Sequence, residues 1–149
     1  TLPNQHEAYR RIGAVYNNAS GDVSAFMQNG DEFMWSVSVN DASASNPGTS
    51  AVLRACTVPP DTHARFTYFM DNVTTAVVYI LVTSPDQADT TPTSTLFNFR
   101  TAATGRPVMG ELVRKTNSSS QIRIRHHASG ASDAVVLTTH GWIDHRGRN

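Results

Sequence analysis

The chain has 149 residues, and its twelve basic residues balance its twelve acidic ones, so the formal net charge at pH 7 is zero. Because nucleic acids and anionic membranes attract a surplus of Lys and Arg, this balance argues against both as partners. No apolar run approaches the ~20 residues that cross a bilayer, which argues against membrane insertion, and a single cysteine excludes an internal disulfide framework. The length predicts one domain, residues 1–149.

The dominant period along the chain is two, which is the period of β-strands. The first runs of this kind are residues 9–16, 23–28 and 32–39. Asn29 and Gly30 lie between the second and third runs, and Asn-Gly is the strongest short signal for a hairpin turn. The chain is therefore expected to open as an antiparallel meander.

Seven further runs follow, separated by turn-forming residues: 51–58, 63–70, 75–84, 95–101, 108–115, 121–127 and 134–144. The run at 75–84 is the most continuously apolar, so it is expected to be a central strand covered on both faces. Residues 40–50 and 84–94 are polar and are expected to be exposed loops. Ten short strands at this spacing predict an all-β fold, an antiparallel two-sheet β-sandwich that is jelly-roll-like.

Six histidines raise the question of a metal site. His126 and His127 are adjacent, so in a strand they point to opposite faces and do not converge on one ion. His140, Asp144 and His145 stand close together, but only His140 and Asp144 share a strand face, and zinc requires three or four ligands. The expectation is no metal and no other cofactor, with polar surface or interface roles for these residues.

Catalytic signatures are not recognisable in the sequence. There is no G-x-S-x-G motif, and Cys56 has no recognisable partner signature for a cysteine nucleophile. Because Cys56 lies in a strand-like run, a buried, inert thiol is expected. Asp86 and Asp89 are the nearest approach to a carboxylate pair, in a loop rather than in a recognisable groove. No catalytic residue is assigned, and the chain is expected not to be an enzyme.

The run at 121–127 carries a small basic patch. Arg123 and Arg125 share the face opposite the apolar residues, and Lys115 lies just across the preceding turn. One interpretation is a solvated face or cross-strand ion pairs with Glu111. The other is contact with an anionic sugar or with a neighbouring subunit.

Aromatic side chains matter because sugar rings stack on exposed aromatic faces. Trp35 lies in an alternating strand, which predicts a position in or near the core. Trp142 follows Gly141 and is flanked by His140 and Asp144, so it is expected to be either an exposed platform or a buried or interface anchor.

Two stretches resemble C-terminal domains of virion proteins from tailed bacteriophages and prophages. Residues 8–35, AYRRIGAVYNNASGDVSAFMQNGDEFMW, are similar to an opening in which a YRRIG strand leads through a turn to an apolar strand and a GDxFxW-like strand. Residues 135–149, VVLTTHGWIDHRGRN, are similar to the terminal GWID-R-G strand of the same proteins. His145 stands where that pattern has an arginine, so a charge role is not carried over to this position.

The resemblance implies a β-sandwich from a tail fibre, tail spike or head fibre, usually homotrimeric and displayed on the extracellular virion surface. The chain would be a C-terminal fragment joined through residues 1–8 to an N-terminal fibre shaft. Such domains bind a host receptor, commonly a bacterial surface polysaccharide or lipopolysaccharide. Residues near the chain start are expected to serve the fold or the trimer interface: Tyr9, Arg10, Arg11 and Trp35. The candidate carbohydrate-binding residues are Trp142, Asp144, Arg123, Arg125, Asp86 and Asp89.

Three other functions compete with non-enzymatic receptor binding. The first is a purely structural module that trimerises and caps a fibre. The second is a polysaccharide-degrading enzyme, which requires a carboxylate pair in a groove. The third is a secreted lectin of a cellular organism.

Overall fold

The computed structural model describes residues 17, 21 and 24–145. These residues form nine strands: β1 (Phe26–Asn29), β2 (Glu32–Ser45), β3 (Val52–Ala55), β4 (His63–Asp71), β5 (Tyr79–Thr83), β6 (Phe99–Arg100), β7 (Val108–Lys115), β8 (Gln121–His126) and β9 (Ala134–Ile143). Over the same residues, no helix long and apolar enough to span a membrane is present.

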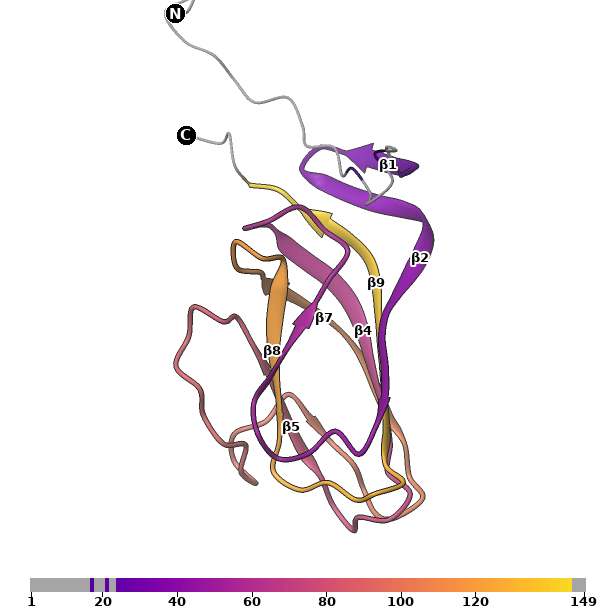
Figure 1. Cartoon of the computed structure of the whole chain (residues 1–149), viewed down its shortest axis with the longest axis vertical. Coiled ribbons are helices and arrows are strands. Elements are labelled where there is room, and N and C mark those ends of the chain that lie inside the picture. Colours follow the sequence, from indigo (N-terminus) through magenta and orange to yellow (C-terminus); the bar gives the residue numbers. More distant parts are fainter. Residues whose placement is uncertain (1–16, 18–20, 22–23, 146–149) are drawn as a thin grey trace, which may run out of the picture.

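The strands form two antiparallel sheets (Figure 1). One sheet has the order β1-β2-β9-β4-β7, and the other has the order β3-β8-β5-β6. From β2 onwards, every connection except the one from β5 to β6 passes from one sheet to the other. This is the strand order of an eight-stranded jelly roll. The predicted all-β sandwich is confirmed.

Strand β4 shows how the sequence builds the core between the sheets. Ala64, Phe66, Tyr68 and Met70 alternate with half-exposed residues, and all four are at most 1% exposed. Because side chains in a strand alternate between its faces, one face of β4 is apolar and packs against the opposite sheet. The other inward faces follow the same rule, so one continuous core fills the sandwich.

An aromatic cluster closes the core where β1, β2 and β9 meet. The Trp142 ring stacks on Phe33 with their centroids 4.9 Å apart, and Trp35 and Phe26 lie at 4.8 and 5.5 Å. The backbones of β9 and β2 approach closely here, since a Cβ on Gly141 would lie 2.0 Å from the Phe33 carbonyl oxygen. Glycine is therefore required beside the tryptophan for this packing.

The structure corrects several predicted strand bounds. Residues 40–45 were expected in a loop, but they continue β2 and pair with β9. Ala42 and Ala44 face inward and pack against the core, so tertiary pairing outweighs the low strand propensity of this Asn-, Asp- and Ser-rich segment. Strands β3 and β6 are shorter than predicted. The predicted strand at residues 9–16 lies outside the described residues.

Strand β5 begins at Tyr79 rather than at the predicted residue 75. Thr74 and Thr75 are held by the Asp133 carboxylate, which keeps this segment out of the sheet. Within β5, residues 80–82 are consecutively buried. The prediction of a strand covered on both faces is therefore confirmed for these three residues.

Candidate functional site

The connection from β5 to β6, residues 84–98, is a long loop that extends from the side of the sandwich (left in Figure 1, pink). Most of its residues are exposed, as the sequence predicts for residues 84–94; residues 95–98, which were expected in a strand, belong to the loop as well. Pro85 and Pro92 lack the N–H that a strand ladder needs, which favours a loop. This loop contacts the outer face of the four-stranded sheet, because its partners Arg123 and Arg125 alternate with the buried Ile122 and Ile124 of β8.

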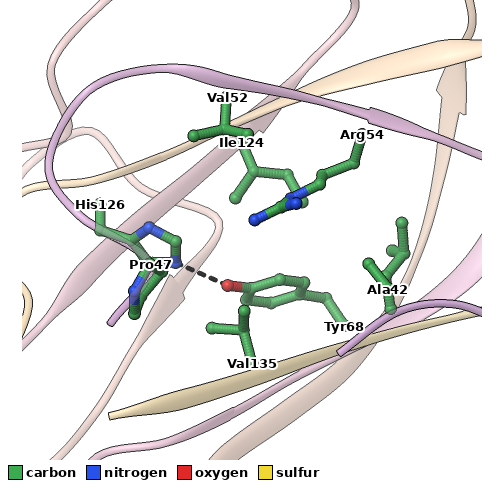
Figure 2. A pocket seen from close by; sticks show the side chains of 9 residues that line it. Ala42, Pro47, Val52, Arg54, Tyr68, Ile124, His126 and Val135 are labelled. Carbon is green, nitrogen blue, oxygen red and sulfur yellow. Dashed lines mark hydrogen bonds between the residues drawn. The ribbon is translucent and has the colours of Figure 1, made fainter. Parts of the chain in front are cut away.

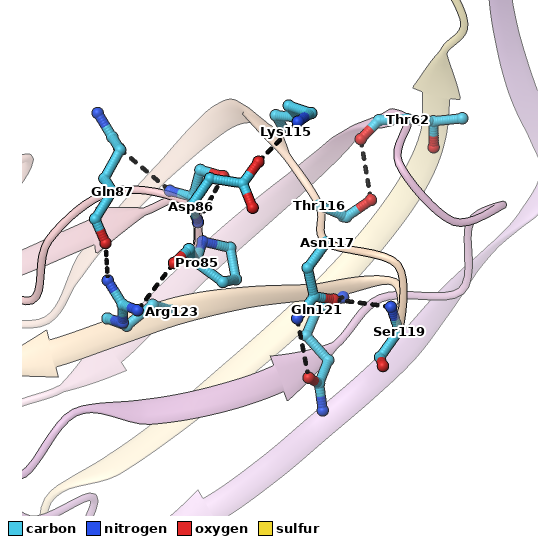
Figure 3. Close-up of polar contacts among 11 residues, drawn as sticks. Thr62, Pro85, Asp86, Gln87, Lys115, Thr116, Asn117, Ser119, Gln121 and Arg123 are labelled. Carbon is cyan, nitrogen blue, oxygen red and sulfur yellow. Dashed lines mark hydrogen bonds and ion pairs between the residues drawn. The ribbon is translucent and has the colours of Figure 1, made fainter.

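The side chain of Arg123 holds this loop through two main-chain carbonyl oxygens of the loop. Its Nη1 donates to the carbonyl oxygen of Gln87 at 2.5 Å, and its Nη2 donates to that of Pro85 at 3.0 Å (Figure 3). A guanidinium presents its N–H groups in a fixed fork, so two such bonds fix the position of the loop as well as its distance. We call residues 84–98, held in this way, the clamped loop.

Two ion pairs add to the clamp. Arg125 Nη1 lies 2.6 Å from Asp89 Oδ2, and Lys115 Nζ lies 2.6 Å from Asp86 Oδ2. The Arg125–Asp89 pair is only partly exposed and contributes up to about 1 kcal/mol, whereas the Lys115–Asp86 pair is exposed and screened by solvent. The structure therefore brings four of the six candidate carbohydrate-binding residues together: Arg123, Arg125, Asp86 and Asp89. It uses them to hold the loop.

The alternative that pairs the basic patch with Glu111 is wrong. Glu111 pairs with Arg65 of β4, which also lies 2.5 Å from Glu32. The reason is topological, because β7 carries Glu111 in one sheet while β8 carries the two arginines in the other. The outer faces of the two sheets point away from each other, so Glu111 cannot reach these arginines, and Lys115, the third member of the patch, pairs with Asp86 instead.

Trp142 and Asp144 do not belong to this site. Trp142 is fully buried in the aromatic cluster, and Asp144 is only 6% exposed. The interpretation of Trp142 as an exposed sugar platform is therefore wrong, and the alternative of a buried anchor is confirmed. Both residues stand in or directly after β9, in the five-stranded sheet, whereas the clamped loop lies against the other sheet.

The residues assigned to the fold or to a trimer interface divide into two groups. Trp35 is 6% exposed and its Nε1 donates to the Thr57 carbonyl oxygen at 2.9 Å, so it has a structural role in the core. Tyr9, Arg10 and Arg11 lie outside the described residues, as does the predicted linker at residues 1–8.

A hollow of about 580 Å³ lies beside the clamped loop, within the size range of small-molecule sites. Its walls come from β5, the loop and β7: Leu81, Val82, Thr83, Gln87, Ala88, Thr90, Leu96, Asn98 and Arg114. It exists because β6 pairs only with Tyr79 and Ile80 and leaves the rest of the β5 edge uncovered.

Side chains replace the missing strand at this edge. Asn98 Oδ1 accepts from the Val82 N–H at 2.7 Å, and Arg114 Nε donates to the Val82 carbonyl oxygen at 2.9 Å. The sequence interpretation missed both residues. A signal for Arg114 was present, since it shares the inward face of β7 with Val108 and Leu112, and a charge in phase with apolar residues is unusual.

A second, internal cavity of about 10 Å³ lies between the sheets, which is room for about one water molecule. Tyr68 and His126 line it, with 2.6 Å between the phenol oxygen and Nε2, and the Arg54 side chain reaches toward them (Figure 2). Burial, and then the charge of Arg54, lower the pKa of His126 to about 4. This imidazole is therefore neutral in the folded protein near pH 7.

The neutral His126 makes the fold sensitive to acid. Its pKa is near 6.5 when unfolded and about 4 when folded, so its contribution to the free energy of unfolding is complete above pH ~6.5. We expect a loss of about 3 kcal/mol as the pH falls from 6.5 to 4. Urea unfolding at a series of pH values measures this loss, and His126→Gln should flatten the profile. An unchanged slope in the variant would contradict the assignment.

His140 and Cys56 both have structural surroundings. His140 is hydrogen-bonded to Ser38 and Thr67 on the outer face of the five-stranded sheet. In the part of the chain that the structure describes, no three His, Cys, Asp or Glu side chains are placed to hold a metal. Cys56 is buried, as predicted, and burial raises its pKa to about 12.

The chain was also compared with known proteins. No protein-family model, curated protein or solved structure matches it. The resemblance to phage virion proteins therefore stays a prediction from residues 8–35 and 135–149.

Proposed function

We propose that this domain recognises a carbohydrate on a bacterial surface, without catalysis, as the receptor-binding part of a bacteriophage fibre or spike. The observation that supports this function is the hollow beside the clamped loop. Its walls combine the apolar side chains of Leu81 and Leu96 with hydroxyl and amide groups of Thr83, Thr90 and Asn98. Sugars present the matching chemistry, with apolar ring faces and hydroxyl edges.

The clamp also supports this proposal. A loop that is already held in place loses little conformational entropy when a ligand binds, so more of the contact energy appears as affinity. The oligomeric state and location in this proposal, a homotrimer on the virion surface, come from the sequence resemblance. Three sites per trimer, on several fibres, would convert weak single contacts into strong attachment through avidity.

One observation favours a structural trimerisation module as a second candidate. The outer face of β7 exposes Met109 and Val113, whose relative exposures are 69% and 37%, and β2 exposes Val37 at 79%. Exposed apolar side chains mark a subunit interface when they adjoin one another; Met109 and Val113 share one face of the edge strand β7, whereas Val37 lies across the sheet, beyond β4 and β9. The two candidates differ in whether the domain binds any glycan.

A glycan array that includes bacterial surface polysaccharides tests the proposal, with the mass in solution measured by light scattering on the same sample. We expect binding to one sugar class by a trimer. A trimer that binds no glycan would favour the structural module instead. A monomer would contradict the fibre assignment.

A further inference from the structure

The hollow beside the clamped loop carries one charge, that of Arg114. None of its lining residues is an Asp or Glu. The nearby carboxylates of Asp86 and Asp89 are already paired with Lys115 and Arg125. The lining is therefore positive, although the whole chain is neutral.

Arg114 has hydrogen-bonding capacity left over. A guanidinium has five N–H donors. Arg114 donates from Nε to Val82 at 2.9 Å and from Nη1 to the Val113 carbonyl oxygen at 2.8 Å, and its other donors have no acceptor among the described residues. The side chain is half-buried, and burial lowers its pKa. A partly desolvated cation without a counter-charge favours the binding of an anion.

Two amide side chains in the same lining are also oriented as donors. Asn98 uses its Oδ1 to accept from Val82, and Gln87 uses its Oε1 to accept from the Ser84 N–H at 3.2 Å. These bonds fix which end of each amide is the oxygen. The amide nitrogens of both residues have no acceptor within residues 24–145. The lining thus offers donors and a positive charge, with few free acceptors.

We propose that this hollow binds an acidic sugar residue, a uronate, whose carboxylate pairs with Arg114. The amide nitrogens of Asn98 and Gln87 donate to its hydroxyl oxygens, and Leu81 and Leu96 contact the apolar face of the ring. The planar fork of Arg114 matches the two oxygens of a carboxylate, which a neutral hexose lacks. This inference rests on the proposed function and narrows it to acidic polysaccharides.

The test compares two sugars that differ only at C6, D-galacturonate and D-galactose. Each is titrated into the isotope-labelled domain, and amide shifts are followed by two-dimensional NMR. We expect galacturonate to shift the amides of residues 81–83, 87–90 and 98, and to bind about tenfold or more tightly than galactose. Added salt should weaken the galacturonate response.

Two variants locate the site. Arg114→Gln removes the charge and should abolish the preference for galacturonate, whereas Arg106→Gln, on an exposed arginine between β6 and β7, should leave it unchanged. Ala88→Phe fills the hollow from an exposed loop position without removing a described contact, so it remains informative if Arg114→Gln fails to fold. Ala131→Phe, at an exposed position between β8 and β9, is its matched control.

The outcomes separate this inference from the proposed function. Equal shifts with both sugars would overturn the acidic preference and leave carbohydrate recognition standing. A glycan hit on the array that survives Ala88→Phe would overturn the hollow as the site. No binding to any glycan on the array, with neither sugar shifting an amide, would overturn both.

Discussion

Replacing Trp142 with alanine is expected to lower the free energy of unfolding by about 3–5 kcal/mol. The side chain is fully buried and stacks on Phe33 with an interplanar angle of 5°. Truncation would leave a cavity that the neighbouring rings cannot fill, because the close approach of β2 and β9 at Gly141 holds these strands in place. Urea unfolding followed by circular dichroism measures the change.

Two further substitutions serve as comparisons for Trp142→Ala. Trp142→Phe should cost about 1–2 kcal/mol, since it keeps an aromatic ring and the indole N–H has no partner among the described residues. Met109→Ala, at a side chain that is 69% exposed, should change stability by under about 0.5 kcal/mol. A loss below about 1 kcal/mol for Trp142→Ala would instead restore its interpretation as a surface platform.

Asp133→Asn is expected to cost about 3–4 kcal/mol. The buried carboxylate accepts from the N–H groups of Val73, Thr74 and Gly130 and from the hydroxyls of Thr74 and Thr75. An amide nitrogen in place of one oxygen would face donors that it cannot pair with. Because these partners lie in two different loops, hydrogen exchange should rise at residues 72–78 and 127–133.

Acid provides a second measurement on Asp133. Burial raises its pKa, but the bonds from Thr75, Thr74 and Gly130 outweigh burial and lower it from 3.8 to about 2. Its stabilising contribution is therefore complete above pH ~4 and is lost as the pH falls toward 2. The Asn variant should lack this part of the acid transition. Asp89→Asn is the control, and should cost under about 1 kcal/mol because its pair with Arg125 is partly exposed.

The period of the sequence is sufficient to predict the sandwich, but not which strands are neighbours. Alternation and the Asn-Gly signal locate β1 and β2, because both act within a few residues. The turn lies one residue later than predicted: Asn29 ends β1 and pairs with Glu32, so Gly30 and Asp31 form the turn. Pairing depends on the path of the whole chain. In a jelly roll, β7 and β8 follow each other in sequence and lie in different sheets, so an ion pair between Glu111 and Arg123 is not available.

The position of Trp142 was ambiguous for a related reason. Strand β9 alternates regularly until Gly141 and Trp142, which are both buried. The neighbouring register shifts between β9 and strands β2 and β4 break the period at this point. Alternation read from the sequence places Trp142 on the same face as His140. It cannot detect a register shift, because the shift depends on partner strands that are distant in sequence.

The candidate site was predicted only in part. The sequence identified Arg123 and Arg125 on a strand and Asp86 and Asp89 in a loop as candidate residues, because each pair is a local pattern. The hollow depends on β6 being two residues long, which leaves Val82 to be satisfied by Arg114 and Asn98. Nothing near residues 99–100 in the sequence signals so short a strand.

The grip of Arg123 has a consequence for how this surface can diverge. Its two bonds reach the carbonyl oxygens of Pro85 and Gln87, and every amino acid carries that atom. The side chain of residue 87, and those farther along the loop, can therefore be exchanged without loosening this attachment. Selection for a different binding target could therefore change the sequence of the loop while Arg123 is retained.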